Sequence, residues 1–269
     1  MKPLIMRSLL SFVIFIFSLG SLAASMYDRR LSDGRFLFDV LLSQGIPREP
    51  LDLTFRMFDY NAGRIPNTNY SVIIDYSLPS TQKRLYLMNF NTGVVERFYA
   101  SHGIRSGVIE TRSFSNQVDS WKSSIGFYFA KGTYVSQKNG LSLYLDGIDY
   151  SNNNARVRSI VLHGAKYVSD EFIQQNGRLG WSEGCPSVAV DANAYIINLL
   201  QSGSIIFSYE RDLLAYSKHY PSDQEKMGNE ILPPGVNTNP TPGEGGDHLP
   251  LPAFFERPEI PYLISPLNF

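Results

Sequence analysis

The chain has a single cysteine, Cys185, in its 269 residues, so it cannot form an internal disulfide bridge. It also has no excess of charge of one sign, because 24 Lys and Arg residues against 25 Asp and Glu residues give a net charge of −1. A strongly basic surface for nucleic acid is therefore not expected. Its longest N-terminal apolar stretch, residues 9–19, is shorter than the roughly 20 residues that a membrane-spanning helix needs.

The N-terminus has the layout of a secretory signal. Lys2 and Arg7 precede the apolar stretch, and small residues follow it. We expect residues 1–25 to be a signal peptide that is cleaved near Ala24, leaving an exported protein with no stable membrane span. An uncleaved membrane anchor is the alternative. In an oxidising compartment a free thiol is a liability unless it is buried or used, so Cys185 is of special interest.

Composition divides the rest of the chain into three parts. Residues 26–68 are expected to be helical, either as a separate small module or as a cap packed on the main domain. Residues 69–215 are expected to form a strand-rich domain, which the 16 Tyr and 17 Phe residues favour. Residues 216–269 hold ten of the sixteen prolines and are expected to be a disordered tail or an arm that packs through its aromatic residues. The predicted fold class is mainly β with a few short helices.

Hydrophobic periodicity places the individual elements. In the helical part, Leu51, Phe55 and Phe58 share one helix face, and Pro50 is suited to the first turn. Further along, Asp191 is expected to be the N-cap of a helix that runs through residue 200. Strands are predicted at 71–76, 84–90, 94–100, 126–130, 141–145, 159–162 and 204–209.

The segment 181–187, with the sequence Trp-Ser-Glu-Gly-Cys-Pro-Ser, is the strongest candidate for chemistry. Gly184 permits unusual backbone angles and Pro186 fixes the next one, so Cys185 lies on a constrained turn. Such a turn can direct the sulfur and backbone N–H groups to one point, where they could stabilise an oxyanion. A thiol is mostly protonated at neutral pH and needs a nearby base or positive charge to become a good nucleophile.

The candidate base is His163, which follows a predicted strand and precedes Gly164. It lies 22 positions before the cysteine, and a buried thiol with an unrelated histidine is the alternative interpretation. His102, which precedes Gly103, could line the same cleft or lie in an exposed loop. No pair of these residues has the close spacing that metal ligands show, so a metal site is not expected.

Five segments carry a resemblance to a known family: 101–107 (Ser-His-Gly-Ile-Arg-Ser-Gly), 114–116 (Phe-Ser-Asn), 145–148 (Leu-Asp-Gly-Ile), 160–164 (Ile-Val-Leu-His-Gly) and 182–186 (Ser-Glu-Gly-Cys-Pro). Over residues 84–210 the chain is similar to the catalytic domain of L,D-transpeptidases of the YkuD type. The resemblance implies a β-sandwich-like catalytic domain in the cell envelope or periplasm, acting on peptidoglycan stem peptides without a metal or organic cofactor.

The resemblance also implies roles for residues. Cys185 would attack the peptide carbonyl that precedes a terminal D-amino acid, and His163 would accept the thiol proton. The Gly164 carbonyl would orient the imidazole, and the N–H groups of Gly184 and Cys185 would hold the oxyanion. An amine acceptor would then give a cross-link, whereas water would make the protein an L,D-carboxypeptidase. A non-catalytic wall-binding protein on the same fold is a third possibility.

The chain departs from the family pattern around the cysteine. Many members have histidine where this chain has Glu183, and Asn or Arg just past the cysteine, where this chain has Pro186 and Ser187. These departures bear on substrate contacts rather than on the cysteine–histidine chemistry. We expect substrate contacts from His102, Ser182 and Arg178, with a solvated loop position as the alternative for Arg178.

Overall fold

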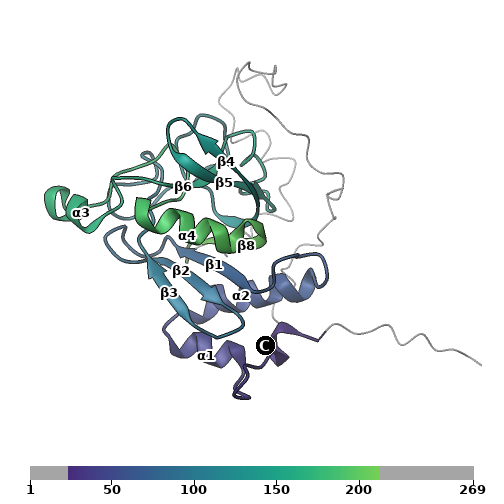
Figure 1. The fold of residues 1–269 in the computed structure, drawn as a ribbon. Helices are drawn as coiled ribbons and strands as arrows, with labels where there is room; N and C mark the ends of the chain where they lie inside the picture. Colours follow the sequence, from purple (N-terminus) through teal and green to yellow (C-terminus); the bar gives the residue numbers. More distant parts are fainter. Residues whose placement is uncertain (1–23, 212–269) are drawn as a thin grey trace, which may run out of the picture.

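The computed structural model describes residues 24–211, and its centre is one eight-stranded sheet (Figure 1). The strands are β1 (Tyr70–Asp75), β2 (Leu85–Asn89), β3 (Val95–Phe98), β4 (Gly126–Ser136), β5 (Gly140–Gly147), β6 (Val161–Gly164), β7 (Ser187–Val188) and β8 (Ser202–Tyr209). The helices within those residues are a 3-10 turn η1 (Met26–Asp28), α1 (Leu37–Ser43), α2 (Arg48–Tyr60), α3 (Asp170–Asn176) and α4 (Val190–Leu200). The predicted mainly β fold with a few short helices is confirmed.

Strand order in the sheet is β3-β2-β1-β8-β4-β5-β6-β7. The pairs β1–β8 and β6–β7 are parallel, and the other neighbours are antiparallel. Val72, Ile73 and Ile74 of β1 are all fully buried, because the sheet is covered on both faces at its centre. A continuous apolar run is typical of such a strand.

Helix α4 covers one face of the sheet. Its residues Ile196, Ile197 and Leu200 are buried in a core shared with β1, β2, β4, β5 and β6. The predicted N-cap was wrong, because Ala189 occupies that position and makes no side-chain cap hydrogen bond. Asp191 instead lies in the first turn of α4, where its carboxylate interacts favourably with the positive end of the helix dipole.

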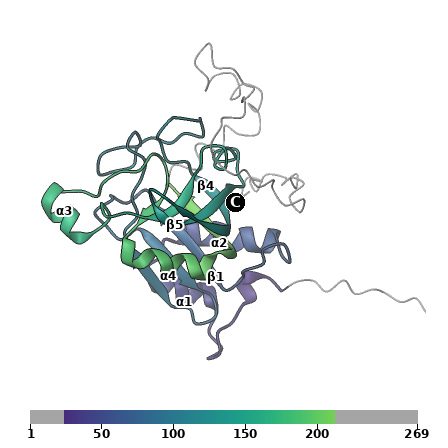
Figure 2. The same cartoon turned by 45° about the horizontal axis from the view of Figure 1, so that its top comes forward.

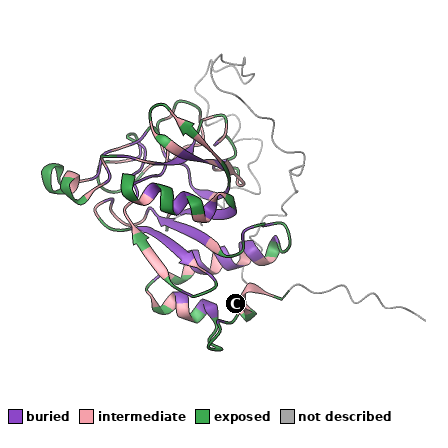
Figure 3. Ribbon diagram, in the orientation of Figure 1, coloured by how far each residue is buried: buried purple, intermediate pink, exposed green. Residues whose placement is uncertain are grey.

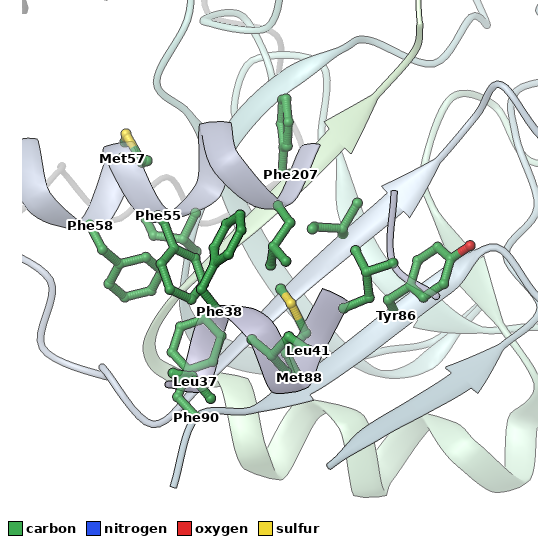
Figure 4. Packing of buried hydrophobic residues seen from close by; sticks show 14 of the residues in the cluster. Leu37, Phe38, Leu41, Phe55, Met57, Phe58, Tyr86, Met88, Phe90 and Phe207 are labelled. Carbon is green, nitrogen blue, oxygen red and sulfur yellow. The ribbon is translucent and has the colours of Figure 1, made fainter. Parts of the chain in front are cut away.

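Helices α1 and α2 cover the opposite face of β1, β2 and β8 (Figure 4). Their aromatic rings pack against one another and against the end of β2. The ring centre of Phe55 in α2 lies 5.1 Å from that of Phe38 in α1 and 5.9 Å from that of Phe90, which follows β2. Edge-to-face contacts of this kind add to the stabilisation that comes from burying apolar area. Helices α1 and α2 are therefore packed on the sheet as a cap.

Helix α3 projects from the edge of the molecule in both views (Figures 1 and 2), and none of its residues is fully buried (Figure 3). Ile173 and a hydrogen bond from the Tyr99 hydroxyl to Asp170 attach it to the neighbouring residues. Local capping defines it: the Ser169 hydroxyl accepts a hydrogen bond from the Phe172 N–H, and Gly177 ends it with φ +70°. This excursion lies between β6 and β7, so it accounts for the long spacing between His163 and Cys185.

Most of the predicted signal peptide and the whole predicted tail, 216–269, lie outside the described residues, so the domain boundaries stay predictions. Between residues 24 and 211 the chain forms no helix with the length and apolar character required to cross a bilayer.

Candidate active site

The parallel pairing of β6 with β7 brings the predicted catalytic residues to one edge of the sheet. His163 in β6 lies opposite Ser187 in β7. Cys185 precedes β7 by two residues, on a turn that joins α3 to this strand. The end of β6 and the start of β7 therefore define the candidate site.

Both ring nitrogens of His163 have partners. Nδ1 lies 3.0 Å from the Gly164 carbonyl oxygen and Nε2 lies 3.0 Å from the Ser187 hydroxyl, which is 3.1 Å from the Tyr167 hydroxyl. Because a carbonyl only accepts, Nδ1 carries the proton and Nε2 accepts from Ser187. Burial lowers the pKa of His163, so the ring is neutral and can act as a base.

Cys185 is half-buried, and its thiol donates to the Ser159 carbonyl oxygen at 3.7 Å. No hydrogen bond joins this thiol to His163 in the described part of the chain. Burial raises the pKa of the Cys185 thiol, so the sulfur is protonated at neutral pH in this conformation. Ser159 has φ +55°, an unfavourable value for a residue with a side chain, and such strain is common at functional sites.

The cysteine turn is held by Ser182. Its hydroxyl donates to the Cys185 carbonyl at 2.6 Å and accepts from the Gly184 N–H at 3.1 Å. Gly184 has φ +122°, which favours glycine at this position. The Gly184 N–H is thus engaged within the turn, whereas the Cys185 N–H has no acceptor among residues 24–211. The oxyanion role of these two groups and the substrate contact of Ser182 stay predictions.

His102 is buried beneath this turn. Its Nδ1 accepts from Arg84 Nη2 at 2.8 Å, and its Nε2 donates to the Gly107 carbonyl at 3.1 Å. The Ser182 N–H donates to the His102 carbonyl at 3.1 Å, which ties the two segments together. Neither ring nitrogen of His102 is free in this structure, so its substrate contact also stays a prediction.

Acid is expected to destabilise the fold through His102. Burial and the Arg84 charge lower the pKa of His102 from 6.5 to about 4. Between these pH values the unfolded chain holds a proton that the folded chain lacks. The contribution of neutral His102 to the free energy of unfolding is therefore complete above pH 6.5. It is lost as the pH falls toward 4, which lowers the free energy of unfolding by up to about 3 kcal/mol.

Urea unfolding of wild type and His102→Gln across pH 4–8 measures this effect. Asp149 titrates in the same range with the opposite sign, because burial raises its pKa to about 6, but it is common to both proteins. The difference between the two free energies of unfolding is expected to shrink as the pH falls. Curves that stay parallel would contradict the buried, neutral state of His102.

Arg178 lies in the sequence between His163 and Cys185. Its guanidinium carbon is 3.4 Å from the centre of the Trp181 ring, and its Nη1 donates to the Leu179 carbonyl at 2.8 Å. The Trp181 indole N–H donates to the Val108 carbonyl at 3.0 Å. Arg178 is thus stacked and half-buried rather than freely solvated, and its predicted substrate contact is not tested by these contacts.

Two residues of the site were missed in the sequence. Ser187 was noted as a departure from the family pattern but not as the partner of His163, and Tyr167 was not singled out. Only the register of β6 with β7 reveals the Ser187 contact. Residues 24–211 contain no cluster of three or more His, Cys, Asp or Glu side chains that could hold a metal ion.

The chain belongs to the L,D-transpeptidase catalytic domain family, whose family model matches residues 43–209. This match covers more than half of the chain, including the β6 strand and the cysteine turn. No curated protein sequence matches the chain significantly.

Several solved structures are similar to this chain at low sequence identity. An L,D-transpeptidase from Mycobacterium smegmatis is 10% identical over 52% of this chain and 58% of its own, with a TM-score of 0.32. The helical cell shape determining protein Pgp2 from Campylobacter jejuni is 13% identical over 60% and 58%, with a TM-score of 0.36. An L,D-transpeptidase from Stackebrandtia nassauensis is 12% identical over 64% and 88%, with a TM-score of 0.33. The chain covers less than two thirds of the length of the first two of these proteins.

Proposed function

We propose that this protein is an exported peptidoglycan L,D-transpeptidase that uses Cys185 as its nucleophile and His163 as its base. The observation that carries the proposal is the β6–β7 pairing, which brings a neutral imidazole to the sheet edge where the only thiol of the chain lies. Membership of the L,D-transpeptidase catalytic domain family supports the reaction class. The envelope or periplasm is the compartment where this substrate is found.

In the proposed acylation, the thiol proton passes to His163 Nε2 and the sulfur attacks the carbonyl that precedes the terminal D-amino acid. The Cys185 N–H, which is without a protein acceptor in residues 24–211, is suited to stabilise the resulting oxyanion. The C–N bond then breaks, and the imidazolium returns its proton to the leaving amine. A thioester on Cys185 and a free D-amino acid are the products.

Two side chains must move before this reaction. The thiol has to rotate about its Cα–Cβ bond from the Ser159 carbonyl toward the ring, and the Ser187 hydroxyl has to release Nε2. Both are single-bond rotations, and catalytic hydrogen bonds often form only when substrate is bound. The Gly164 carbonyl keeps the ring in the required tautomer throughout.

The second step decides between transpeptidase and carboxypeptidase. An amine from a neighbouring stem peptide that attacks the thioester gives a cross-linked dimer, whereas water gives a shortened stem peptide. In both cases His163 takes a proton from the attacking group and the sulfur leaves as the thiolate, which is then reprotonated.

Product analysis by mass spectrometry tests the proposal. Purified exported protein is incubated with tetrapeptide muropeptides, and released D-alanine, dimers and tripeptides are measured. Dimers with released D-alanine are the expected result. Tripeptides alone would make the protein a carboxypeptidase, and unchanged substrate with retained binding to sacculi would favour a wall-binding protein.

A further inference from the structure

Arg158 ends the turn that leads into β6 and points its guanidinium into segment 115–124. Its Nη1 donates to the Ser115 carbonyl at 2.8 Å and to the Ser124 hydroxyl at 2.9 Å. Its Nη2 donates to the Lys122 carbonyl at 2.5 Å and to the Ser120 hydroxyl at 3.2 Å. All four acceptors are neutral, so these bonds fix the segment without neutralising the charge.

The same guanidinium lies directly against the cysteine turn. A Cβ atom on Gly184 would come within 3.1 Å of Arg158 Nη2 and 2.8 Å of the Lys122 carbonyl oxygen. The Ser123 hydroxyl also donates to the Gly184 carbonyl at 3.2 Å. Arg158 immediately precedes Ser159, whose carbonyl accepts the thiol hydrogen bond. The cysteine turn therefore packs against Arg158 and segment 115–124.

The charged and titratable groups that interact electrostatically with the thiol are Arg158, Lys138, Glu183, Tyr76 and Tyr167. Lys138 and Glu183 are exposed and pair with each other at 3.3 Å. The two tyrosines are neutral at neutral pH, because burial raises the pKa of each. Arg158 forms no ion pair within residues 24–211, so it is the cation whose charge is left to act on the sulfur.

We propose that Arg158 is a positioning residue that holds segment 115–124 against Gly184 and places a positive charge where Cys185 ionises. The proposal deepens the proposed function and rests on it for its biological meaning. The charge of Arg158 favours the thiolate over the thiol when the thiol proton passes to His163 Nε2. Arg158 lowers the pKa of the thiol, opposing the effect of burial.

The pH dependence of Cys185 alkylation by iodoacetamide tests this, with the full exported chain and intact-mass detection. In Arg158→Gln we expect the pKa of the thiol to rise by about one unit and alkylation at pH 7 to slow about tenfold. Arg158→Lys keeps the charge and is expected to stay within about half a unit of wild type. Arg156→Gln is the matched control, because Arg156 lies two residues away and pairs with Asp146 at 2.6 Å; its thiol should titrate like wild type.

An unchanged titration in folded Arg158→Gln, or an equal shift in Arg156→Gln, would overturn the proposal. If Arg158→Gln does not fold, Arg158→Lys decides: a pKa near wild type supports the role of the charge, and a rise of a unit or more contradicts it. Alkylation needs no peptidoglycan. A wild type that fails to process muropeptides while Arg158→Gln still shifts the titration would therefore remove the proposed function and leave the role of Arg158 intact.

Discussion

Replacing Cys185 with alanine is expected to abolish muropeptide processing, with a loss of at least about a thousandfold in turnover. No other thiol exists in the chain to substitute for it. The fold should survive, because the side chain is only half-buried and its hydrogen bond to the Ser159 carbonyl is long, at 3.7 Å. Dimer and D-alanine release, followed over time by mass spectrometry, measure the effect.

Thermal unfolding of the same Cys185→Ala protein is the control, with a melting temperature expected within a few degrees of wild type. Arg35→Met is a control variant near the N-terminal end of the described chain, since it removes only an exposed pair with Asp33, and it should retain most activity. A Cys185→Ala protein that still makes cross-links would remove the cysteine mechanism.

The largest loss of stability is expected from Arg84→Ala. Arg84 is fully buried and donates to the carbonyls of Ala100 and Leu78, the Thr111 hydroxyl and His102 Nδ1. Truncation leaves three buried acceptors and the half-buried Leu78 carbonyl without this donor, and it opens a cavity against the sheet. We expect the free energy of unfolding to fall by about 3–5 kcal/mol.

Urea unfolding of Arg84→Ala beside Arg112→Ala measures this difference. Arg112 is exposed and pairs with Glu110 at the surface, so its loss should change stability by less than about 1 kcal/mol. Equal effects of the two substitutions would show that the buried guanidinium does not organise this part of the core. The pKa of Arg84 falls to about 10 through burial, so it stays charged at neutral pH.

Strands were predictable where apolar residues alternate or run together. The stretch 71–76 contains most of β1, and 204–209 lies within β8. Strand β4 was predicted to end at Ala130, but it continues to Ser136. The prediction stopped too early because a register shift between Ala130 and Thr133 breaks the alternation of apolar and polar residues. Strand β7 has two residues, too few for any periodicity.

Helix α3 could not be recognised from apolar periodicity. None of its residues is fully buried, and Ile173 is its one contact with a hydrophobic cluster, so hydrophobic periodicity does not reveal the helix. The serine at position 169 and the glycine at position 177 are recognisable capping signals, and together they could have identified the helix. Local chemistry defines this element, whereas tertiary packing defines the strands beside it.

At the site, the cysteine turn and His163 could be singled out from residue types, since few side chains can act as nucleophile and base. Their partners could not. Ser187 meets His163 only through strand register, and Arg158 reaches Gly184 only because segment 115–124 folds back over the turn. The sequence left His102 as a residue of the cleft or of an exposed loop, and it gave no sign of the hydrogen bond to Arg84, 18 positions earlier.

The most direct test is to trap the acyl-enzyme. Wild-type protein is mixed with a tetrapeptide donor in the absence of an amine acceptor, quenched in acid, digested, and mapped by mass spectrometry. The account predicts that the peptide containing Cys185 gains the mass of the donor less one D-alanine. Rapid substrate turnover with this peptide unmodified at every time point, or the same adduct on a different residue, would contradict it.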